Sequence, residues 1–309
     1  MRAAGSGIRL MMTTDAVGGV WTYATTLARS LGSSGFEVLL VTLGPSPTSA
    51  QKAAVRGCQG VSVIETDLEL EWQDPAGADL GHAAVELRRI ADRFGPDLIH
   101  LNSFREATFD GSVPKVVVAH SCVNSWAEAC GETDAFTGEE WNVYSRCIRA
   151  GLRDADVWVA PTRAFRDQLV SLYCLNQGGT VIWNGVDIPQ NKRADKQPVV
   201  LGAGRVWDKA KNLSVLSSAA SSADWPIRIA GASRPDRSTI AERAGDCQFL
   251  GEISHRALLH QMDSASIFVS PALYEPFGLS VLEAASAGCA LMLSDIATFR
   301  ELCYGAALF

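Results

Sequence analysis

Residues 270–288 read Ser-Pro-Ala-Leu-Tyr-Glu-Pro-Phe-Gly-Leu-Ser-Val-Leu-Glu-Ala-Ala-Ser-Ala-Gly, and this stretch decides the fold. The β-branched and aromatic run before it, residues 265–269, predicts a buried strand, and Pro276 and Gly278 predict a tight turn after that strand. From Leu279 the apolar residues have helical spacing. A helix that begins at the carboxyl end of a strand presents unpaired N–H groups and a positive dipole end, so we predict an anion site here.

Two carboxylates flank the predicted anion site. Glu275 precedes the predicted helix, and Glu283 lies in its second turn. A carboxylate repels a diphosphate directly, but it accepts hydrogen bonds from the sugar hydroxyls on either side of one. We therefore interpret the pair as part of a nucleotide-sugar site. An ordinary strand-loop-helix, with Glu283 near the favourable helix start and Glu275 in solvent, is the alternative interpretation.

The bulk composition is that of a globular protein. The chain has 309 residues, of which 47% are hydrophobic, which is enough for two domains. A net charge of −7 and a pI near 5.3 argue against nucleic-acid binding, which requires clustered Lys and Arg. No window approaches the roughly 18 to 20 apolar residues of a membrane span, and residues 1–10 lack a signal-peptide apolar region. We expect a cytoplasmic protein without a transmembrane segment; peripheral membrane contact stays open.

The sequence contains no pattern typical of a metal or a redox cofactor. Its eight cysteines form no Cys-x-x-Cys pair, and its five histidines have no metal-ligand spacing. Residues 202–207, Gly-Ala-Gly-Arg-Val-Trp, resemble the start of a dinucleotide fingerprint, but Trp207 stands where the third glycine belongs. We therefore reject NAD and expect no metal and no cofactor.

The first part of the chain predicts a βαβ unit. Strands are expected over residues 8–14 and 38–43, with a helix over 21–31 between them. Gly18 and Gly19 lie in the loop that follows the first of these strands. Ligands of a parallel sheet bind beyond the carboxyl ends of its strands, which is where these glycines are expected.

Alternating strands and helices continue to residue 183 and begin again at residue 199. The polar segment 188–197 between them is typical of an interdomain linker. The sequence therefore predicts an α/β protein with two Rossmann-like doubly wound domains, residues 1–187 and residues 188–309.

A second cationic loop follows the first predicted strand of the second domain. Arg205 lies at the strand end, Lys209 and Lys211 are close by, and Asn212 is expected to open a helix. Cations near a helix start suit a phosphate. A solvated basic loop is the alternative interpretation.

His120 directly follows the strand predicted over residues 116–119, where a sheet exposes side chains to ligands. A lone histidine is more often structural than functional. Asp15 is expected to hold its loop by an Asx-type turn, while contact with an acceptor hydroxyl is the less favoured role. Gly18 and Gly19 allow a ligand to approach the backbone closely.

Glu275 and Glu283, separated by seven residues, embedded in Pro-Phe-Gly-Leu and followed by Ala-Ser-Ala-Gly, closely resemble the signature of family 4 retaining glycosyltransferases. This family includes glycogen synthase-like enzymes and bacterial mannosyl- and glucosyltransferases. The resemblance implies that Glu275 is catalytic and contacts the donor sugar, and that Glu283 contacts the nucleotide ribose. It also implies that the backbone N–H groups of Phe277, Gly278 and Leu279 hold the diphosphate.

The same resemblance assigns roles to residues elsewhere in the chain. Arg205 and Lys211 have the spacing of the arginine and lysine that clamp the donor diphosphate in the family. His120 corresponds to a histidine that approaches the donor sugar and the acceptor hydroxyl, so we expect it to be catalytic. Gly18 and Gly19 are expected to contact the donor.

The resemblance implies a GT-B fold, in which two domains face each other across a cleft, and transfer of a hexose from a nucleoside diphosphate sugar to an acceptor hydroxyl. The acceptor is a glycan, a lipid or a small molecule; the anomeric configuration is retained and no metal is needed. Family members normally continue for several dozen residues past Phe309, so we expect a truncated second domain. An epimerase or hydrolase on the same fold and a non-catalytic sugar-nucleotide-binding protein are the alternatives.

Overall fold

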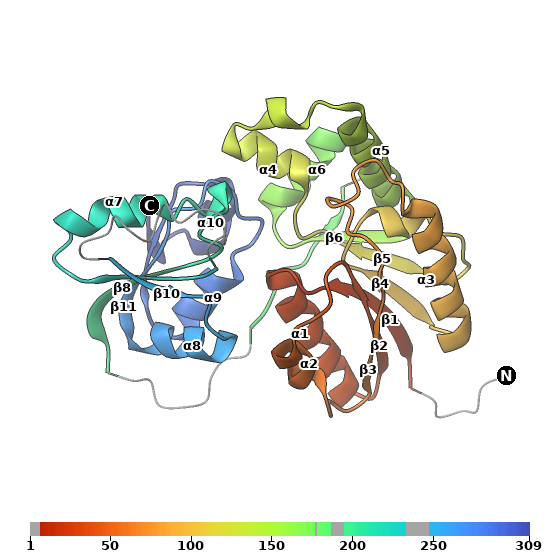
Figure 1. Cartoon of the computed structure of the whole chain (residues 1–309), viewed down its shortest axis with the longest axis horizontal. Helices are drawn as coiled ribbons and strands as arrows, with labels where there is room; N and C mark the ends of the chain where they lie inside the picture. The colour runs from red at the N-terminus through yellow and green to blue at the C-terminus, as the bar shows by residue number, and fades with distance from the viewer. Residues whose placement is uncertain (1–6, 177, 187–194, 233–246) are drawn as a thin grey trace. The chain divides into compact units, whose positions relative to one another are not determined.

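The computed structural model describes residues 7–176, 178–186, 195–232 and 247–309. The chain divides into two compact units, residues 1–127 with 132–183 and residues 128–131 with 184–309 (Figure 1). The predicted boundary at residue 187 and residues 188–194 of the predicted linker lie outside the described residues.

The described part of the first unit contains a sheet of seven parallel strands in the order β3-β2-β1-β4-β5-β6-β7. The order runs outward in both directions from β1, as the doubly wound prediction requires. The strands are β1 (Arg9–Asp15), β2 (Glu37–Leu43), β3 (Val61–Glu65), β4 (Leu98–Leu101), β5 (Lys115–Val118), β6 (Val157–Ala160) and β7 (Thr180–Val181). The last strand is shorter than the one predicted over residues 180–183, because Ile182 and Trp183 are exposed.

Helices cover both faces of this sheet, and α1 and α3 lie on opposite sides of it in Figure 1. The α-helices are α1 (Gly19–Ser33), α2 (Ser49–Val55), α3 (Leu80–Phe94), α4 (Val123–Cys130), α5 (Glu139–Asp154) and α6 (Arg163–Tyr173), with 3-10 turns η1 (Arg105–Thr108) and η2 (Thr133–Phe136). Helix α4 and both 3-10 turns were not predicted from the sequence.

The core on the α1 side shows why this pairing forms. Leu10 and Met12 alternate along β1 and share one buried cluster with Trp21, Ala24 and Ala28 of α1. The two alanines are one turn apart, so they let the helix lie close to the strand. Strand β1 is buried on both faces from Leu10 to Thr14, as expected of a central strand in a parallel sheet that is covered on both sides.

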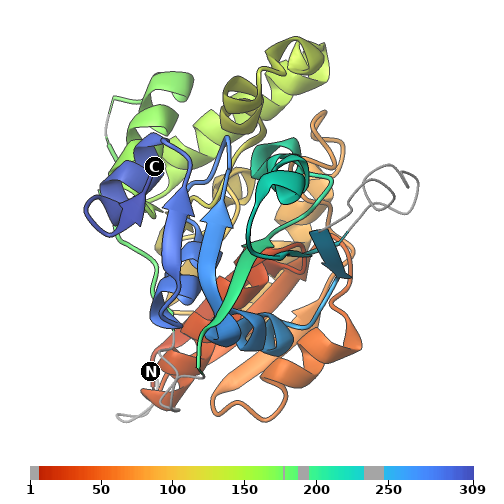
Figure 2. The same ribbon diagram turned by 90° about the vertical axis from the view of Figure 1, so that its left-hand side faces the viewer.

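The described part of the second unit contains a sheet of six parallel strands in the order β10-β9-β8-β11-β12-β13. Figure 2 shows β8, β11 and β12 side by side. The strands are β8 (Gln197–Ala203), β9 (Ile227–Ala230), β10 (Cys247–Gly251), β11 (Ala265–Ser270), β12 (Ala290–Leu293) and β13 (Ala307–Leu308).

The helices of this unit are α7 (Ser214–Ala219), α8 (His255–Ser264), α9 (Leu279–Ser286) and α10 (Ala297–Cys303), with 3-10 turns η3 (Lys209–Lys211) and η4 (Ala220–Ser222). Helix α9 begins at the residue that the sequence predicts. It packs Val281 and Ala284 into one cluster with Phe268 of β11 and Phe299 of α10. The helix that periodicity predicts over residues 236–244 lies outside the described residues.

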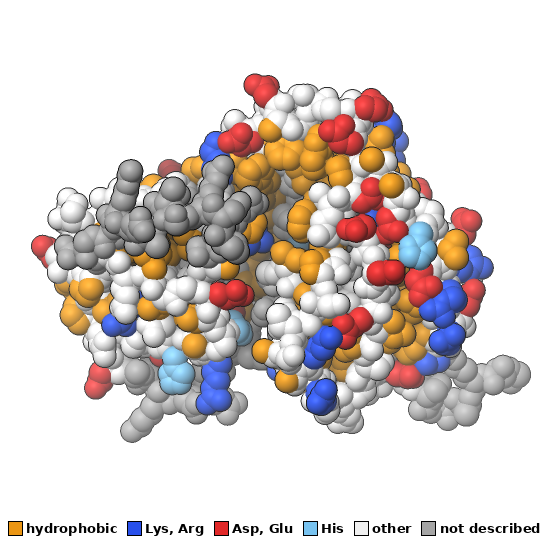
Figure 3. All heavy atoms as spheres, viewed as in Figure 1, with side chains coloured by type: hydrophobic (Ala, Val, Ile, Leu, Met, Phe, Trp, Pro, Cys, Tyr) orange, Lys and Arg blue, Asp and Glu red, His pale blue; other side chains and the backbone are white. Residues whose placement is uncertain are grey.

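Figure 3 shows basic and acidic side chains interspersed over the face of the first unit that it displays. Within the described ranges, none of the helices is both long enough and apolar enough to cross a membrane.

The packing of α5 on η1 gives a test of the close contacts in the core of the first unit. A β-carbon added at Gly151 lies 1.9 Å from the carbonyl oxygen of Phe104, so Gly151→Ala forces the two elements apart. We expect it to lower the free energy of unfolding by about 1–3 kcal/mol, measured by thermal and urea denaturation.

The matched control is Gly81→Ala near the start of α3, where an added β-carbon meets nothing within 4 Å. Because alanine has the higher helix propensity, this variant gains up to about 1 kcal/mol. Equal effects of the two substitutions would contradict the close contact at Gly151.

Candidate active site

Each sheet has one place where the strand order reverses, and the predicted site residues lie there. In the first sheet this place is between β1 and β4, and in the second it is between β8 and β11. Loops that leave neighbouring strands in opposite directions open a crevice at the carboxyl edge, which is where doubly wound sheets bind ligands. The two places are in different units, and each forms its own group of residues.

In the first unit, Asn102 connects the end of β4 to both neighbouring strands. Its Nδ2 donates to the Thr13 carbonyl at 2.7 Å, and its backbone N–H donates to Thr13 Oγ1 at 3.0 Å. This fixes the amide so that Oδ1 faces His100 Nε2 at 3.1 Å and His120 Nε2 at 2.8 Å. An amide oxygen only accepts, so both rings carry their proton on Nε2, and Nδ1 of each neutral ring is the acceptor.

Burial keeps this histidine pair uncharged. Burial lowers the pKa of His100 to about 4. Burial, together with repulsion from His100 when that ring is protonated, lowers the pKa of His120 to about 3. The ring of Tyr23 lies edge-on to His120 at 4.7 Å between centroids, and burial raises the pKa of Tyr23 to about 12. At neutral pH the predicted catalytic His120 is therefore a neutral hydrogen-bonding group.

The loop after β1 leads into the start of α1. Asp15 Oδ1 accepts a hydrogen bond from the Val17 backbone N–H at 2.7 Å, which confirms the expected Asx-type turn. Gly18 has a φ of 89°, a conformation that favours glycine, and α1 begins at Gly19. Because Tyr23 of α1 contacts His120, these two predicted donor-binding glycines lie on the helix that reaches the histidine pair.

In the second unit, hydrogen bonds tie the loop after β8 to the loop after β11. Asn212 Nδ2 donates to the Pro271 carbonyl at 3.1 Å, and the Leu273 N–H donates to the Ala210 carbonyl at 2.8 Å. The expectation that Asn212 opens a helix is wrong. Asn212 has a left-handed φ of 51° and ends the turn η3, and α7 begins only at Ser214.

Two of the cations predicted in this loop, Lys211 and Arg205, are paired with carboxylates. Lys211 Nζ lies 2.5 Å from Glu275 Oε2, so the fold brings these two predicted site residues into direct contact. Arg205 Nη2 lies 2.7 Å from Asp208 Oδ2, and the Arg205 guanidinium lies 5.4 Å from the Trp207 ring centroid. Asp208 is buried and also accepts from the Ala210 N–H at 3.0 Å. The loop is therefore an ordered ionic structure rather than a freely solvated basic segment.

Helix α9 begins beside this ionic structure. Gly278 is its N-cap residue with a φ of 91°, and an added β-carbon there lies 3.1 Å from Phe299 and 3.3 Å from Glu275. The Phe277 side chain is buried, which fixes the backbone that enters the helix at Leu279. The predicted diphosphate-binding residues Phe277, Gly278 and Leu279 therefore lie at the positive end of α9, next to Glu275.

Glu283 lies in the second turn of α9 and is largely buried, with a side chain that is 9% exposed. Its Oε1 lies 2.7 Å from His255 Nε2, at the first residue of α8. Ser254 caps this helix by accepting from the Ala257 N–H at 3.2 Å.

Sequence reasoning missed several polar residues of these groups: Asn102, His100, Asp208 and His255. Asn102 directly follows a predicted strand, as His120 does, so the same sheet-edge argument identifies it. His255 is 28 residues from its partner on another helix, and no spacing rule connects the two.

Among the described residues, no group of three or more His, Cys, Asp or Glu side chains is arranged to hold a metal ion.

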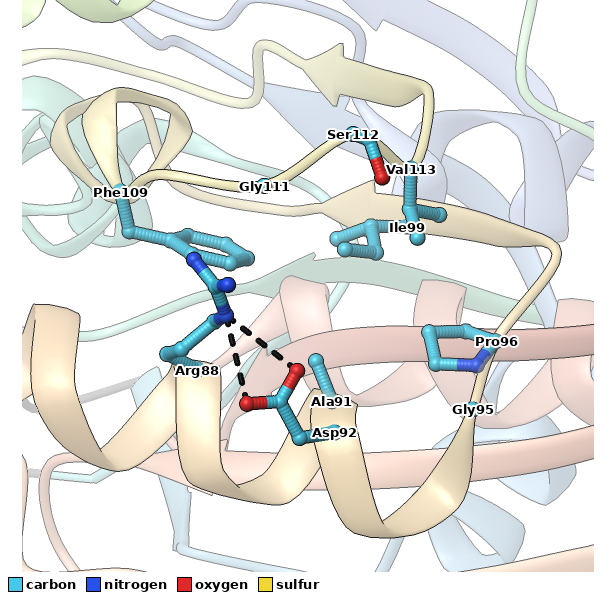
Figure 4. A pocket seen from close by; sticks show the side chains of 10 residues that line it. All are labelled: Arg88, Ala91, Asp92, Gly95, Pro96, Ile99, Phe109, Gly111, Ser112 and Val113. Atoms are coloured by element: carbon cyan, nitrogen blue, oxygen red, sulfur yellow. Dashed lines mark hydrogen bonds and ion pairs between the residues drawn. The ribbon is translucent and has the colours of Figure 1, made fainter.

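A cavity of about 210 Å³ lies away from these residues, at the opposite edge of the first sheet (Figure 4). Pro96 and Val113, which line it, precede β4 and β5, whereas Asn102 and His120 follow those strands. Arg88 and Asp92 form an ion pair at its border. This cavity is not part of the candidate site.

Solved structures show the class of fold. Sucrose-phosphate synthase from Thermosynechococcus elongatus is similar over 95% of this chain and 82% of its own, with 19% identity and a TM-score of 0.72. Anabaena HepE, solved in complex with UDP and glucose, is similar over the same shares, with 16% identity and a TM-score of 0.69. The fold is that of the GT-B glycosyltransferases.

Sequence comparison then shows the family. Residues 17–190 match the model of Glycosyltransferase Family 4, and residues 186–303 match that of Glycosyl transferases group 1. The first match covers more than half of the chain, so the chain belongs to Glycosyltransferase Family 4. It is a glycosyltransferase with a nucleotide-sugar donor.

Two curated relatives match this chain at low to moderate identity. Glycogen synthase of Mycobacterium tuberculosis is 24% identical over 334 residues, which cover 92% of this chain and 76% of that protein. Phosphatidyl-myo-inositol mannosyltransferase of Mycolicibacterium smegmatis is 33% identical over 145 residues, which cover 41% of this chain and 37% of that protein.

The histidine pair gives a test by nitrogen-correlated NMR. We expect the side chains of His100 and His120, assigned with His→Gln variants, to be neutral Nε2–H tautomers at about pH 5, where an unperturbed histidine is mostly protonated. Titration of either ring near about pH 6.5 would contradict the buried cluster.

The same pKa shifts predict an acid-sensitive stability. Both pKa values are lower in the folded state, so below about pH 6.5 the unfolded chain binds protons that the folded chain does not. The free energy of unfolding therefore decreases progressively as the pH falls from about 6.5 toward about 3, the lower of the two folded-state pKa values. Thermal melts across this range test it, with His100→Gln expected to flatten the pH dependence.

Proposed function

We propose that this protein transfers a hexose from a nucleoside diphosphate sugar to an acceptor hydroxyl, with retention of configuration and without a metal ion. The observation that carries the proposal is the contact of Lys211 with Glu275 beside the start of α9. A cation, a carboxylate and a helix N-terminus meet at the point where the second sheet reverses its strand order. This combination suits a diphosphate joined to a hydroxyl-rich sugar.

Departure of the nucleoside diphosphate places negative charge on the phosphates and positive charge on the sugar ring. Lys211, Arg205 and the N–H groups at the start of α9 stabilise the leaving diphosphate more in the transition state than in the ground state. They take the electrostatic role that a metal ion has in other enzymes. Glu275, oriented by Lys211, accepts a hydrogen bond from the donor sugar.

Two further groups bind hydroxyls. Glu283 accepts hydrogen bonds from the nucleotide ribose. In the first unit, His120 is held neutral with its proton on Nε2, so its Nδ1 accepts from a hydroxyl of the reacting sugars. Because that ring does not protonate near neutral pH, it acts by orientation and not by donating a proton.

The chemical step is a substitution at the anomeric carbon from the leaving-group side. The bond from that carbon to the phosphate oxygen breaks as the bond to the acceptor oxygen forms, and the departing phosphate oxygen takes the acceptor proton. The products are a nucleoside diphosphate and a glycoside of unchanged configuration. The acceptor is a glycan, a lipid or a small molecule.

The cysteines support the cytoplasm as the place of this reaction. None of the eight forms a disulfide bond, and a reducing compartment keeps cysteines in the thiol state.

The donor site is tested with two lysines of the same turn. Lys211→Ala is expected to weaken binding of UDP, GDP or ADP, whichever the wild type binds, by about 10- to 100-fold, the value of a hydrogen bond to a charged group. The exposed Lys209 is the matched control, and Lys209→Ala changes the affinity by no more than about 2-fold. Calorimetry gives both values, and equal losses would refute the assignment of Lys211.

Glu275→Gln separates catalysis from binding. The amide keeps the shape of the side chain but loses the charge, so we expect transfer to fall by at least about 100-fold while the melting temperature stays near that of the wild type. A variant with unchanged transfer would remove Glu275 from the mechanism.

Metal independence and retention of configuration are tested by two measurements of the transfer reaction. We expect transfer to continue after dialysis against a chelator, and the anomeric proton coupling of the product to match that of the donor sugar. Loss of activity that added Mg²⁺ or Mn²⁺ restores would overturn metal independence, and inverted coupling would overturn retention.

A further inference from the structure

A histidine on α8 touches the carboxylate to which the proposed function assigns ribose binding. His255 Nε2 lies 2.7 Å from Glu283 Oε1. The Glu283 side chain is 9% exposed, whereas that of His255 is 51% exposed. The carboxylate is thus held from the solvent side by a ring that exchanges protons freely with water.

The two partners are fixed by their helices. His255 is the first residue of α8, which Ser254 caps. Glu283 lies in the second turn of α9, which begins at Leu279. Helices α8 and α9 pack against each other. A hydrogen bond from His255 occupies Oε1 and leaves Oε2 as the oxygen available to a ligand.

We propose that His255 is a positioning residue for the nucleotide, which holds Glu283 so that Oε2 faces the pair of ribose hydroxyls, and that its protonation sets the affinity for the donor. The inference rests on the proposed function, because it concerns the same donor site.

The surroundings of His255 make Glu283 its main electrostatic partner. Helix α8 packs against α9, β8 and β11. Neither β8 nor β11 contains a charged residue, and Glu283 is the one charged residue of α9. On α8 itself the titratable or charged residues are Arg256, His260 and Asp263.

Protonation of His255 therefore changes the strength of its hydrogen bond to Glu283. The hydrogen bond to Glu283 raises the pKa of His255, against the opposite effect of burial. A protonated ring gives a charge-assisted hydrogen bond and offsets the charge of Glu283 near the diphosphate. A neutral ring holds the carboxylate more weakly and leaves that charge uncompensated. Donor affinity is thus higher below the His255 pKa and falls as the pH rises through it.

The experiment measures binding of UDP-glucose, ADP-glucose and GDP-mannose by calorimetry from about pH 5.5 to about pH 8.5, since a histidine titrates in this range. Nucleotide sugars are used because their phosphates do not titrate there. For the donor that binds, we expect the wild type to lose roughly 3- to 10-fold in affinity across the range, and His255→Gln to be weaker than the wild type at the low end and nearly independent of pH.

His260→Gln is the matched control, because it removes an exposed histidine from the same helix. It should keep the wild-type pH profile. The double variant His255→Gln with Glu283→Gln should be no weaker than Glu283→Gln alone, because His255 acts only through Glu283.

The outcomes separate the two proposals. If the wild type binds a donor and His255→Gln keeps both its affinity and its pH profile, the positioning role is wrong and the proposed function stands. A lower melting temperature of His255→Gln without a change in the binding profile also overturns it, since that is a structural role. If the folded wild type binds none of the donors, the proposed donor site fails, and the role of His255 fails with it.

Discussion

The parallel pairing of strands on both sides of β1 and of β8 is the constraint on which the rest of the structure depends. A parallel strand can follow its neighbour only through a crossover, so successive loops leave the sheet at its carboxyl edge. Where the order reverses, the loops on the two sides separate and the polar residues at the strand ends meet. Thr13, near the end of β1, meets Asn102 after β4 in this way, and Lys211 after β8 meets Glu275 after β11.

The polar groups at the two reversal points differ in charge: they are neutral in the first unit and ionised in the second. In the first, one amide oxygen holds two rings that burial keeps neutral. In the second, two cations of the loop are joined to carboxylates, Lys211 to Glu275 and Arg205 to Asp208. Burying an unpaired charge is costly, so a half-buried cationic loop keeps its shape only with such partners. Neutral groups suit hydroxyls, and paired ions suit a diphosphate with its sugars.

Local patterns were enough to predict most of the fold. The turn at Gly278 and the strands that flank it follow from backbone preferences and apolar runs, and residues 255–264 and 279–286 form helices as their periodicity indicates. Helix α4 is as long as α9, but it was not predicted because no turn signal like Pro276 and Gly278 precedes it. Asn212 escaped it because the same residue type starts helices and also accepts a left-handed φ, and only contact with Pro271 decides between the two.

Within the candidate site, the short motif was enough to predict the local placement of Glu275, Gly278 and Glu283 around the start of α9. Pairings between distant segments could not be predicted in this way. His255 and Glu283 lie on separate helices, and Asn102 joins histidines of two strands, so these contacts follow from the tertiary fold alone. Local patterns in the sequence likewise do not predict how the two units are placed relative to each other.

In the donor site that we propose, the contact between Lys211 and Glu275 would also select among anions. An anion that takes Lys211 leaves Glu275 without its hydrogen-bond donor, in a position that is only 15% exposed. Free phosphate would bind Lys211 and leave the Glu275 carboxylate without a hydrogen-bond donor, which costs free energy. A sugar diphosphate would replace both partners, because its phosphates would bind the lysine and its hydroxyls would bind the carboxylate. The proposed site would therefore discriminate against inorganic anions before any donor binds.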